Sequence, residues 1–192
     1  MVKENTELMA EARESLSGNW GLAIATFLVY GIIISIFQVI PTVGPVLVLF
    51  IAGPMLVGIS MFSLSLSRGE NARLEQIFEG FKNYGTVLGA YLLMVVLILL
   101  WMLLLIIPGI IAAIAYSQTF YILAEDDAIS SMDALKKSKE MMDGYKWKYF
   151  CLGLRFIGWA LLCILTLGIG FLWLSPYIQI SYAKFYEDIK TA

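Results

Sequence analysis

The sequence contains no histidine among its 192 residues. This absence excludes a Ser-His-Asp triad, a histidine proton shuttle and a His-Glu-x-x-His zinc site. No Walker loop, dinucleotide-binding glycine pattern or Cys-x-x-Cys motif is present. Lys and Arg number 13 against 15 Asp and Glu, and no basic surface indicates nucleic acid. We therefore expect a protein that is not an enzyme, holds no cofactor or metal and has no nucleic-acid partner.

Charge is also scarce, since charged residues make up 15% of the chain and hydrophobic residues 60%. Soluble domains carry about 25% charged residues. No Asp, Glu, Lys or Arg occurs from 15 to 67 or from 83 to 124, and Arg155 is the only one from 149 to 183. Because about 20 apolar residues can cross a bilayer, each stretch has room for two helices. The composition predicts an all-α polytopic membrane protein.

The chain reads as a single integral membrane domain, 1–192, built from three similar units. Each unit begins with a charged amphipathic segment that ends near a glycine, and Gly18, Gly80 and Gly144 are 62 and 64 residues apart. Each continues as two apolar runs separated by a Gly or Pro-Gly break, which is typical of a helical hairpin. The units are 3–67, 70–125 and 127–189, and their six expected transmembrane helices are 19–40, 45–67, 84–107, 109–124, 147–167 and 170–185.

The positive charges indicate the topology. With six spans, every Lys and Arg except Arg155 falls on one side, and the opposite turns contain none. The positive-inside rule then places both termini and the amphipathic helices in the cytoplasm. We expect a multi-pass protein of the bacterial cytoplasmic membrane.

Arg155 is the one basic or acidic residue well inside an expected span. Burying its charge costs at least about 2.5–3.5 kcal/mol, so such a residue is a functional candidate. One interpretation is that Arg155 snorkels to the interface or pairs with a local partner such as Glu125. The other is a role in an anion or headgroup pathway.

Two pairs of polar residues occupy matching positions in the second and third units. Tyr116 and Gln118 match Tyr177 and Gln179 at an offset of 61 residues. They are hydrogen-bonding glue between helices in one interpretation, worth about 0.6–2 kcal/mol each. In the other they line a polar cavity of a transporter built from repeats.

The amphipathic segments carry the candidate lipid and partner contacts. In the third segment, Ser130-x-x-Asp133 resembles a capping box at the start of a helix. The basic cluster on and after this helix would attract anionic lipid headgroups, or would simply form a solvated face. The first segment has an acidic stripe, for which there are three interpretations. It is a solvated face, it packs against the basic cluster, or it docks a basic partner. The candidate contacts are Lys136, Lys137, Lys139, Lys146, Lys148, Glu7 and Glu11.

Several short motifs resemble the bacterial integral membrane family known as domain of unknown function 975, which is common in Gram-positive bacteria. The motifs are Gly18-Asn19-Trp20, Ile107-Pro108-Gly109-Ile110, Ala134-Leu135-x-x-Ser138-Lys139, Phe156-Ile157-Gly158-Trp159 and Thr166-Leu167-Gly168-Ile169-Gly170. The pattern is similar, more distantly, to the membrane domain of glycerophosphodiester phosphodiesterases. The resemblance implies a six-helix cytoplasmic-membrane protein and supplies no activity or site. Arg155 stands where that family would be expected to have a small or apolar residue.

These observations favour a non-enzymatic protein that binds or organises membrane lipids or partner proteins through its cytoplasmic interfacial helices. The lipids would include anionic headgroups, and the partners would be membrane or cytoplasmic proteins. The alternative is a transporter or exporter of a small solute, lipid or peptide, with Tyr116, Gln118, Tyr177 and Gln179 along its path.

Overall fold

The computed structural model describes residues 2–41 and 43–191, and the described chain is helical without any strand. The elements are α1 (Asn5–Leu16), α2 (Trp20–Gln38), α3 (Gly44–Ser67), the 3-10 helix η1 (Leu74–Phe81), α4 (Tyr84–Leu104), α5 (Ile106–Ala115), α6 (Thr119–Glu125), α7 (Ser131–Met141), α8 (Lys146–Leu165) and α9 (Phe171–Lys190). The expected all-α class is therefore confirmed.

Five segments of the described chain are long and apolar enough to cross a membrane: α2, α3, α4, the α5–α6 segment and α8. Helix α9 takes the place of the expected sixth span but is not one of the five. Its last two turns carry Lys184, Glu187, Asp188 and Lys190, which lower its hydropathy. A membrane protein is supported, whereas six spans stay a prediction.

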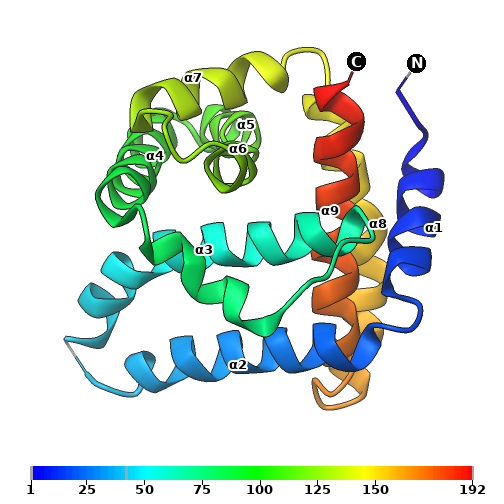
Figure 1. Cartoon of the computed structure of the whole chain (residues 1–192). Helices are drawn as coiled ribbons and strands as arrows, with labels where there is room; N and C mark the ends of the chain where they lie inside the picture. The colour runs from blue at the N-terminus through cyan, green and yellow to red at the C-terminus, as the bar shows by residue number, and fades with distance from the viewer. Residues whose placement is uncertain (1, 42, 192) are drawn as a thin grey trace.

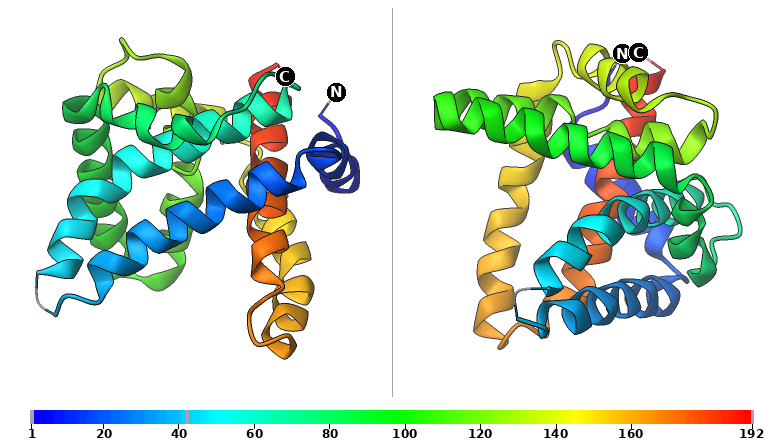
Figure 2. Two further views of the ribbon diagram at one scale, coloured as in Figure 1. Left: turned by 60° about the horizontal axis from the view of Figure 1, so that its bottom comes forward. Right: turned by 90° about the vertical axis from the view of Figure 1, so that its left-hand side faces the viewer.

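The long helices form three hairpins that run in three different directions. In Figure 1, α2 and α3 run across the view, α8 and α9 run up it, and α4 to α6 are seen almost end-on. The side view in Figure 2 shows the complementary picture, in which α4 runs across and α8 stays upright. Both termini lie at the same end of the molecule (Figure 1). The hairpins therefore diverge instead of forming a parallel bundle.

Within each hairpin, one helix is peripheral and the other is central. Only 11% of the apolar window is buried in α2 and in α4, and 17% in α8, against 56% in α3 and 50% in the α5–α6 segment. The central helices also contact each other, because α3 packs against both α6 and α9. Exposed apolar side chains on the peripheral helices would be costly in water, so their natural surroundings are lipid chains.

Each short element that precedes a hairpin packs on a central helix of another hairpin, and α7 packs on a peripheral helix as well. Helix α1 packs on α9, η1 packs on α3, and α7 packs on α4 and α6. Helix α7 begins as expected, because the Ser130 hydroxyl accepts a hydrogen bond from the Asp133 N–H at 3.2 Å. Helices α1 and α7 both end before a glycine in the left-handed region, Gly18 (φ 82°) and Gly144 (φ 78°).

Element η1 lies against α3 with the two backbones in direct contact. A Cβ on Gly58 would lie 2.1 Å from the Ile77 carbonyl oxygen, and one on Gly80 would lie 2.1 Å from the Pro54 carbonyl oxygen. Gly80 therefore has a different role from Gly18 and Gly144, because it permits a close approach instead of a left-handed turn.

The expected fourth span, 109–124, is two helices, since the segment turns between Ala115 and Thr119. The buried Ser138 hydroxyl of α7 donates to the Ala115 carbonyl at 2.9 Å and accepts from the Gln118 N–H at 3.2 Å. These bonds replace helical hydrogen bonds that the turn has lost. Helix α7 thus stabilises the break.

Candidate functional sites

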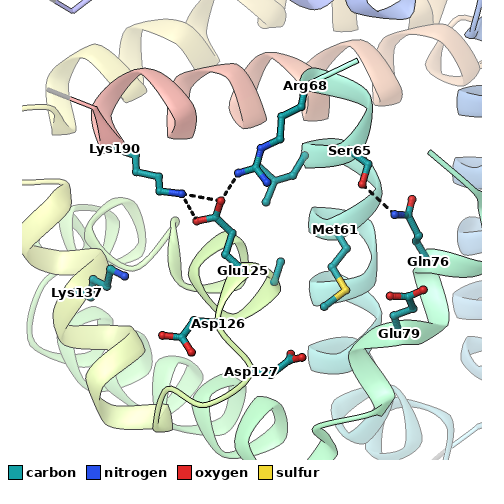
Figure 3. A pocket seen from close by; sticks show the side chains of 12 residues that line it. Met61, Ser65, Arg68, Gln76, Glu79, Glu125, Asp126, Asp127, Lys137 and Lys190 are labelled. Carbon is teal, nitrogen blue, oxygen red and sulfur yellow. Dashed lines mark hydrogen bonds and ion pairs between the residues drawn. The ribbon is translucent and has the colours of Figure 1, made fainter. Parts of the chain in front are cut away.

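A polar cavity of about 670 Å³ lies where the ends of the three central helices meet (Figure 3). Besides these helices, η1 and α7 contribute to its wall. Its lining residues are Met61, Leu64, Ser65, Arg68, Gln76, Glu79, Ala124, Glu125, Asp126, Asp127, Lys137 and Lys190. Both signs of charge therefore face one cavity.

Glu125, the last residue of α6, is the centre of an ion-pair cluster in this cavity. Lys190 of α9 donates to both of its carboxylate oxygens at 2.7 and 2.8 Å, and Arg68 after α3 donates to one of them. The Tyr186 hydroxyl donates to it at 2.6 Å. Figure 3 shows Arg68 and Lys190 converging on Glu125 from two different helices. The cluster therefore links all three hairpins through one carboxylate.

Arg68 also donates to Glu187 of α9, at 3.1 Å from Nε and 2.5 Å from Nη2. Burial acts to lower the pKa of the Arg68 guanidinium, but its hydrogen bonds to Glu187 and Glu125 outweigh this effect and hold the pKa above its ordinary value. Arg68 thus keeps its charge at any physiological pH. Lys184 donates to the Ser67 carbonyl at 2.5 Å and caps the end of α3 in addition.

The chemistry that this cluster can perform is limited. Arg68 and Lys190 already form ion pairs with Glu125, and Arg68 forms a second one with Glu187. The described residues also contain no group of three His, Cys, Asp or Glu side chains suited to a metal ion. We interpret the cluster as the element that holds the three hairpins together.

A second cavity, of about 310 Å³, places a cation among aromatic rings. The Arg13 guanidinium of α1 lies 5.7 Å from the centre of the Tyr177 ring of α9, a cation–π distance. Three tryptophans complete an otherwise apolar wall: Trp20, Trp159 and Trp173.

A third cavity, of about 190 Å³, has the same kind of lining between the second and third hairpins. Lys139 of α7 and Lys146 of α8 line it together with Tyr116 and Trp101. Pro108, at the start of α5, lies in the same wall.

The two cation–aromatic cavities use residues at matching positions of the sequence. Tyr116 and Tyr177 are 61 residues apart, and Lys139 and Arg13 each lie five residues before the glycine that follows their helix. Neither Arg13 nor Lys139 forms an ion pair with a carboxylate in the described part of the chain. Each therefore offers an unneutralised charge beside aromatic rings.

The two glutamines, Gln118 and Gln179, do not line either of the cation–aromatic cavities. Gln179 donates to the Tyr121 hydroxyl at 2.8 Å and joins α9 to α6, as expected of hydrogen-bonding glue. Gln118 is fully buried, donates to the neighbouring Ser117 hydroxyl, and has a buried side-chain oxygen without a hydrogen-bond partner among the described residues. Tyr116 and Tyr177 line different cavities, so the structure does not bring the four side chains into one path.

The structure scatters the basic cluster over several surfaces. Lys137 lines the polar cavity, Lys139 and Lys146 line the third cavity, Lys148 pairs with Asp188 at 3.0 Å, and Lys136 is exposed. The five lysines therefore do not form a single patch.

The acidic stripe on α1 does not pair with the basic cluster. Glu11 pairs with Lys3 at 2.5 Å, an interaction that raises the pKa of the Lys3 ammonium, and Glu7 accepts from the Glu4 N–H at 3.0 Å. The contact between α1 and the basic segment is instead a hydrogen bond from the Asn5 amide to the Lys148 carbonyl, at 3.0 Å.

Arg155 lies on an exposed face of α8, and no ion pair to it exists among the described residues. The suggested partner Glu125 is occupied by Arg68 and Lys190. Arg13, Arg68 and Glu187 were not singled out as site residues from the sequence. The equal spacing of Arg13 and Lys139 from their glycines was the signal that could have revealed Arg13.

A comparison with protein families decides the family of the chain. The model of a protein family of unknown function, DUF975, matches residues 1–111 and 95–192, and these two matches together cover the whole sequence. The chain belongs to the DUF975 family. No curated protein and no solved structure matches it. The more distant similarity to the membrane domain of glycerophosphodiester phosphodiesterases stays a prediction. DUF975 membership brings no activity, so the function has to be argued from the cavities.

Proposed function

We propose that this protein is a non-enzymatic lipid-binding protein of the bacterial cytoplasmic membrane, with both termini in the cytoplasm. Its ligands are lipids with phosphate-bearing, anionic headgroups. The interfacial helices α1 and α7 supply the contacts.

The observation that carries this proposal is the pair of matched cavities. Each places one cation of an interfacial helix, Arg13 or Lys139, beside a tyrosine and tryptophan, and neither cation pairs with a carboxylate among the described residues. Arg and Lys bind phosphate through charge-assisted hydrogen bonds, and Trp and Tyr favour the level of the headgroups. A cation near the membrane surface attracts anionic lipid with about 1 kcal/mol.

The contacts among the elements support a finer architecture, in which three hairpin units of one ancestral pattern are arranged in a ring. Each short element packs on the central helix of the preceding unit: α1 on α9, η1 on α3, and α7 on α6. The first long helix of each unit does the same, with α2 on α9, α4 on α3, and α8 on α5. In this arrangement six helices are embedded in the membrane, with α9 as the sixth.

The test is native mass spectrometry of the protein extracted gently from bacterial membranes. We expect phosphate-bearing anionic lipids to remain bound to the parent protein. Arg13→Gln and Lys139→Gln should each lower the retained anionic lipid at least about tenfold, because losing a hydrogen bond between a charged side chain and a phosphate costs about 1.5–3 kcal/mol.

Arg155→Gln is the matched control, because it also removes one exposed cation but from outside the cavities. Its loss should be no more than about fivefold, the effect of a surface cation without a binding cavity. If it released as much lipid as Arg13→Gln or Lys139→Gln, binding would be non-specific and the proposal wrong. A protein partner that stays bound while no lipid does, or solute flux in liposomes, would favour the two alternative functions instead.

A further inference from the structure

The segments that join the two helices of each hairpin have an unusual composition. These three tips, residues 39–45, 103–108 and 165–170, contain no charged residue. Their apolar side chains are exposed, with Val39 at 79%, Leu103 at 88% and Leu167 at 95%. Loops in water are normally polar, so these tips are not suited to an aqueous surface.

The backbone of the third tip meets the requirement for hydrocarbon surroundings. Every backbone N–H from Thr166 to Leu174 donates to an acceptor within the same turn, including that of Gly170, which donates to the Thr166 hydroxyl. A backbone group without a partner costs several kcal/mol in a bilayer, so such a turn can remain there.

The other two tips meet this requirement in part. In the first tip, Val39, Ile40, Val43 and Gly44 donate to nearby carbonyls, and two prolines have no N–H to satisfy. In the second tip, the Leu105 N–H donates to the Trp101 carbonyl at 3.0 Å, and Pro108 again has no N–H. The N–H groups of Ile106 and Ile107, in the first turn of α5, have no acceptor among the described residues.

The distance from charged groups to the tips is short. Arg13 lies over Tyr177, which is seven residues after Gly170 at the end of the third tip. At 1.5 Å per residue, the tip extends only about 10 Å beyond the level of this cation. The hydrocarbon core of a bilayer is about 30 Å thick.

The second hairpin gives the same result more directly. Lys139 and Lys146 line one cavity of about 190 Å³ with Pro108, a residue of the second tip. Two lysines and a tip that share so small a cavity cannot stand on opposite sides of a 30 Å core.

The first hairpin agrees. The Tyr84 hydroxyl, two residues after Lys82, donates to the Phe50 carbonyl at 3.3 Å. Phe50 is six residues after Gly44, or about 9 Å along α3 from the first tip.

We infer that all three hairpins enter the bilayer from the side that carries the charged residues, and that their tips end in the hydrocarbon interior about one leaflet deep. The tips are thus an interaction surface whose partner is lipid acyl chains. This topology has one wetted face and replaces six complete crossings with three re-entrant hairpins. It rests on membrane residence and not on the proposed lipid selectivity.

Exposed Arg155 fits this depth. It lies ten residues before the end of α8, or about 15 Å along the helix, which is half the thickness of the core. In a complete crossing it would lie near the middle of the bilayer, whereas here its guanidinium lies near the headgroups.

The test uses the full chain in native membranes with Cys151→Ala and Cys163→Ala, which leave no other thiol. Single substitutions Leu167→Cys and Leu104→Cys probe two tips, and Asn71→Cys, in the exposed segment between α3 and η1, is the control. A membrane-impermeant maleimide is applied to spheroplasts and to inverted vesicles. We expect the Asn71→Cys variant to react from one side only, and the two tip variants from neither side until detergent is added.

Reaction of the Leu167→Cys variant from the side opposite to the Asn71→Cys variant would show a complete crossing and overturn the inference. A second measurement uses a fluorophore on the tip thiol and nitroxide-labelled lipids in proteoliposomes. We expect mid-chain nitroxides to quench at least twofold more strongly than headgroup nitroxides. Weak quenching by both would mean that protein covers the tip, and it too would overturn the inference.

Folding is checked by monodisperse elution in detergent and by full labelling there, and Ile169→Cys replaces a tip variant that aggregates. The outcome is separate from that of the lipid-retention experiment. If the tips stay unlabelled, the topology is supported even if the Arg13→Gln variant retains all its lipid. If that variant loses lipid, the proposed lipid binding is supported even if the tips cross the membrane.

Discussion

At the scale of single residues, Glu125 is the side chain on which the ion-pair cluster depends, since Arg68, Lys190 and Tyr186 all donate to it. Only 17% of the side chain is exposed, and its partners come from the ends of α3 and α9. Removing one member of a partly buried ion-pair network leaves the other charges without compensation, which costs more than the intact network contributes.

We therefore expect Glu125→Gln to lower the free energy of unfolding by about 1–3 kcal/mol. Glu187→Gln is the matched control and should cost less than about 1 kcal/mol, because Arg68 then keeps Glu125 as its partner. Thermal unfolding in mild detergent measures both. Equal losses from the two variants would contradict the central role of Glu125.

At the scale of elements, the contact between η1 and α3 depends on two glycines. The α3 and η1 backbones approach so closely at Gly58 and Gly80 that any side chain would meet a carbonyl oxygen. Such a contact cannot be relieved by turning a flexible side chain, so the whole of η1 would have to shift away from α3.

Gly58→Ala should destabilise the protein by about 2–3 kcal/mol and expose η1 to proteolysis. Gly21→Ala in α2 is the control, since nothing lies within 4 Å of its added Cβ, and it should be neutral or stabilising by up to about 1 kcal/mol. Limited proteolysis and thermal unfolding report the two effects. If the Gly58→Ala variant were as resistant as the control, the close packing would be wrong.

At the scale of the whole molecule, polar and apolar parts are separated between two ends. The ion-pair cluster and both termini lie at one end, where the central helices meet, and the exposed apolar tips diverge from it. Insertion from one side follows from this separation, because only the tips can enter hydrocarbon without a charge.

Leu167→Arg tests this separation by placing a charge in the most exposed tip position. If that tip lies in hydrocarbon, the charge costs at least about 2.5 kcal/mol and the amount of protein in the membrane fraction falls sharply. Asn71→Arg, at the polar end, should leave that amount unchanged. A normal amount of the Leu167→Arg variant would place the third tip in water.

The predicted helices were close to the observed ones because apolar length and glycine breaks are local signals. The expected 84–107 span ends within three residues of Leu104, and the expected start at 147 lies one residue after Lys146. The turn between α5 and α6 could not be predicted, since it depends on Ser138, which is 20 residues away in sequence. The cavity around Arg13 was missed for the same reason, because Tyr177 belongs to the last helix.

The sequence by itself determined the membrane class, most of the helices and the family, because these follow from composition, periodicity and short motifs. Only the tertiary structure decided how the charges are paired and how far the tips lie from them. Apolar length says that a helix can cross a bilayer, but not how it lies in one. That depends on contacts between distant residues, such as Arg13 with Tyr177 and the two lysines beside Pro108, which no local pattern contains.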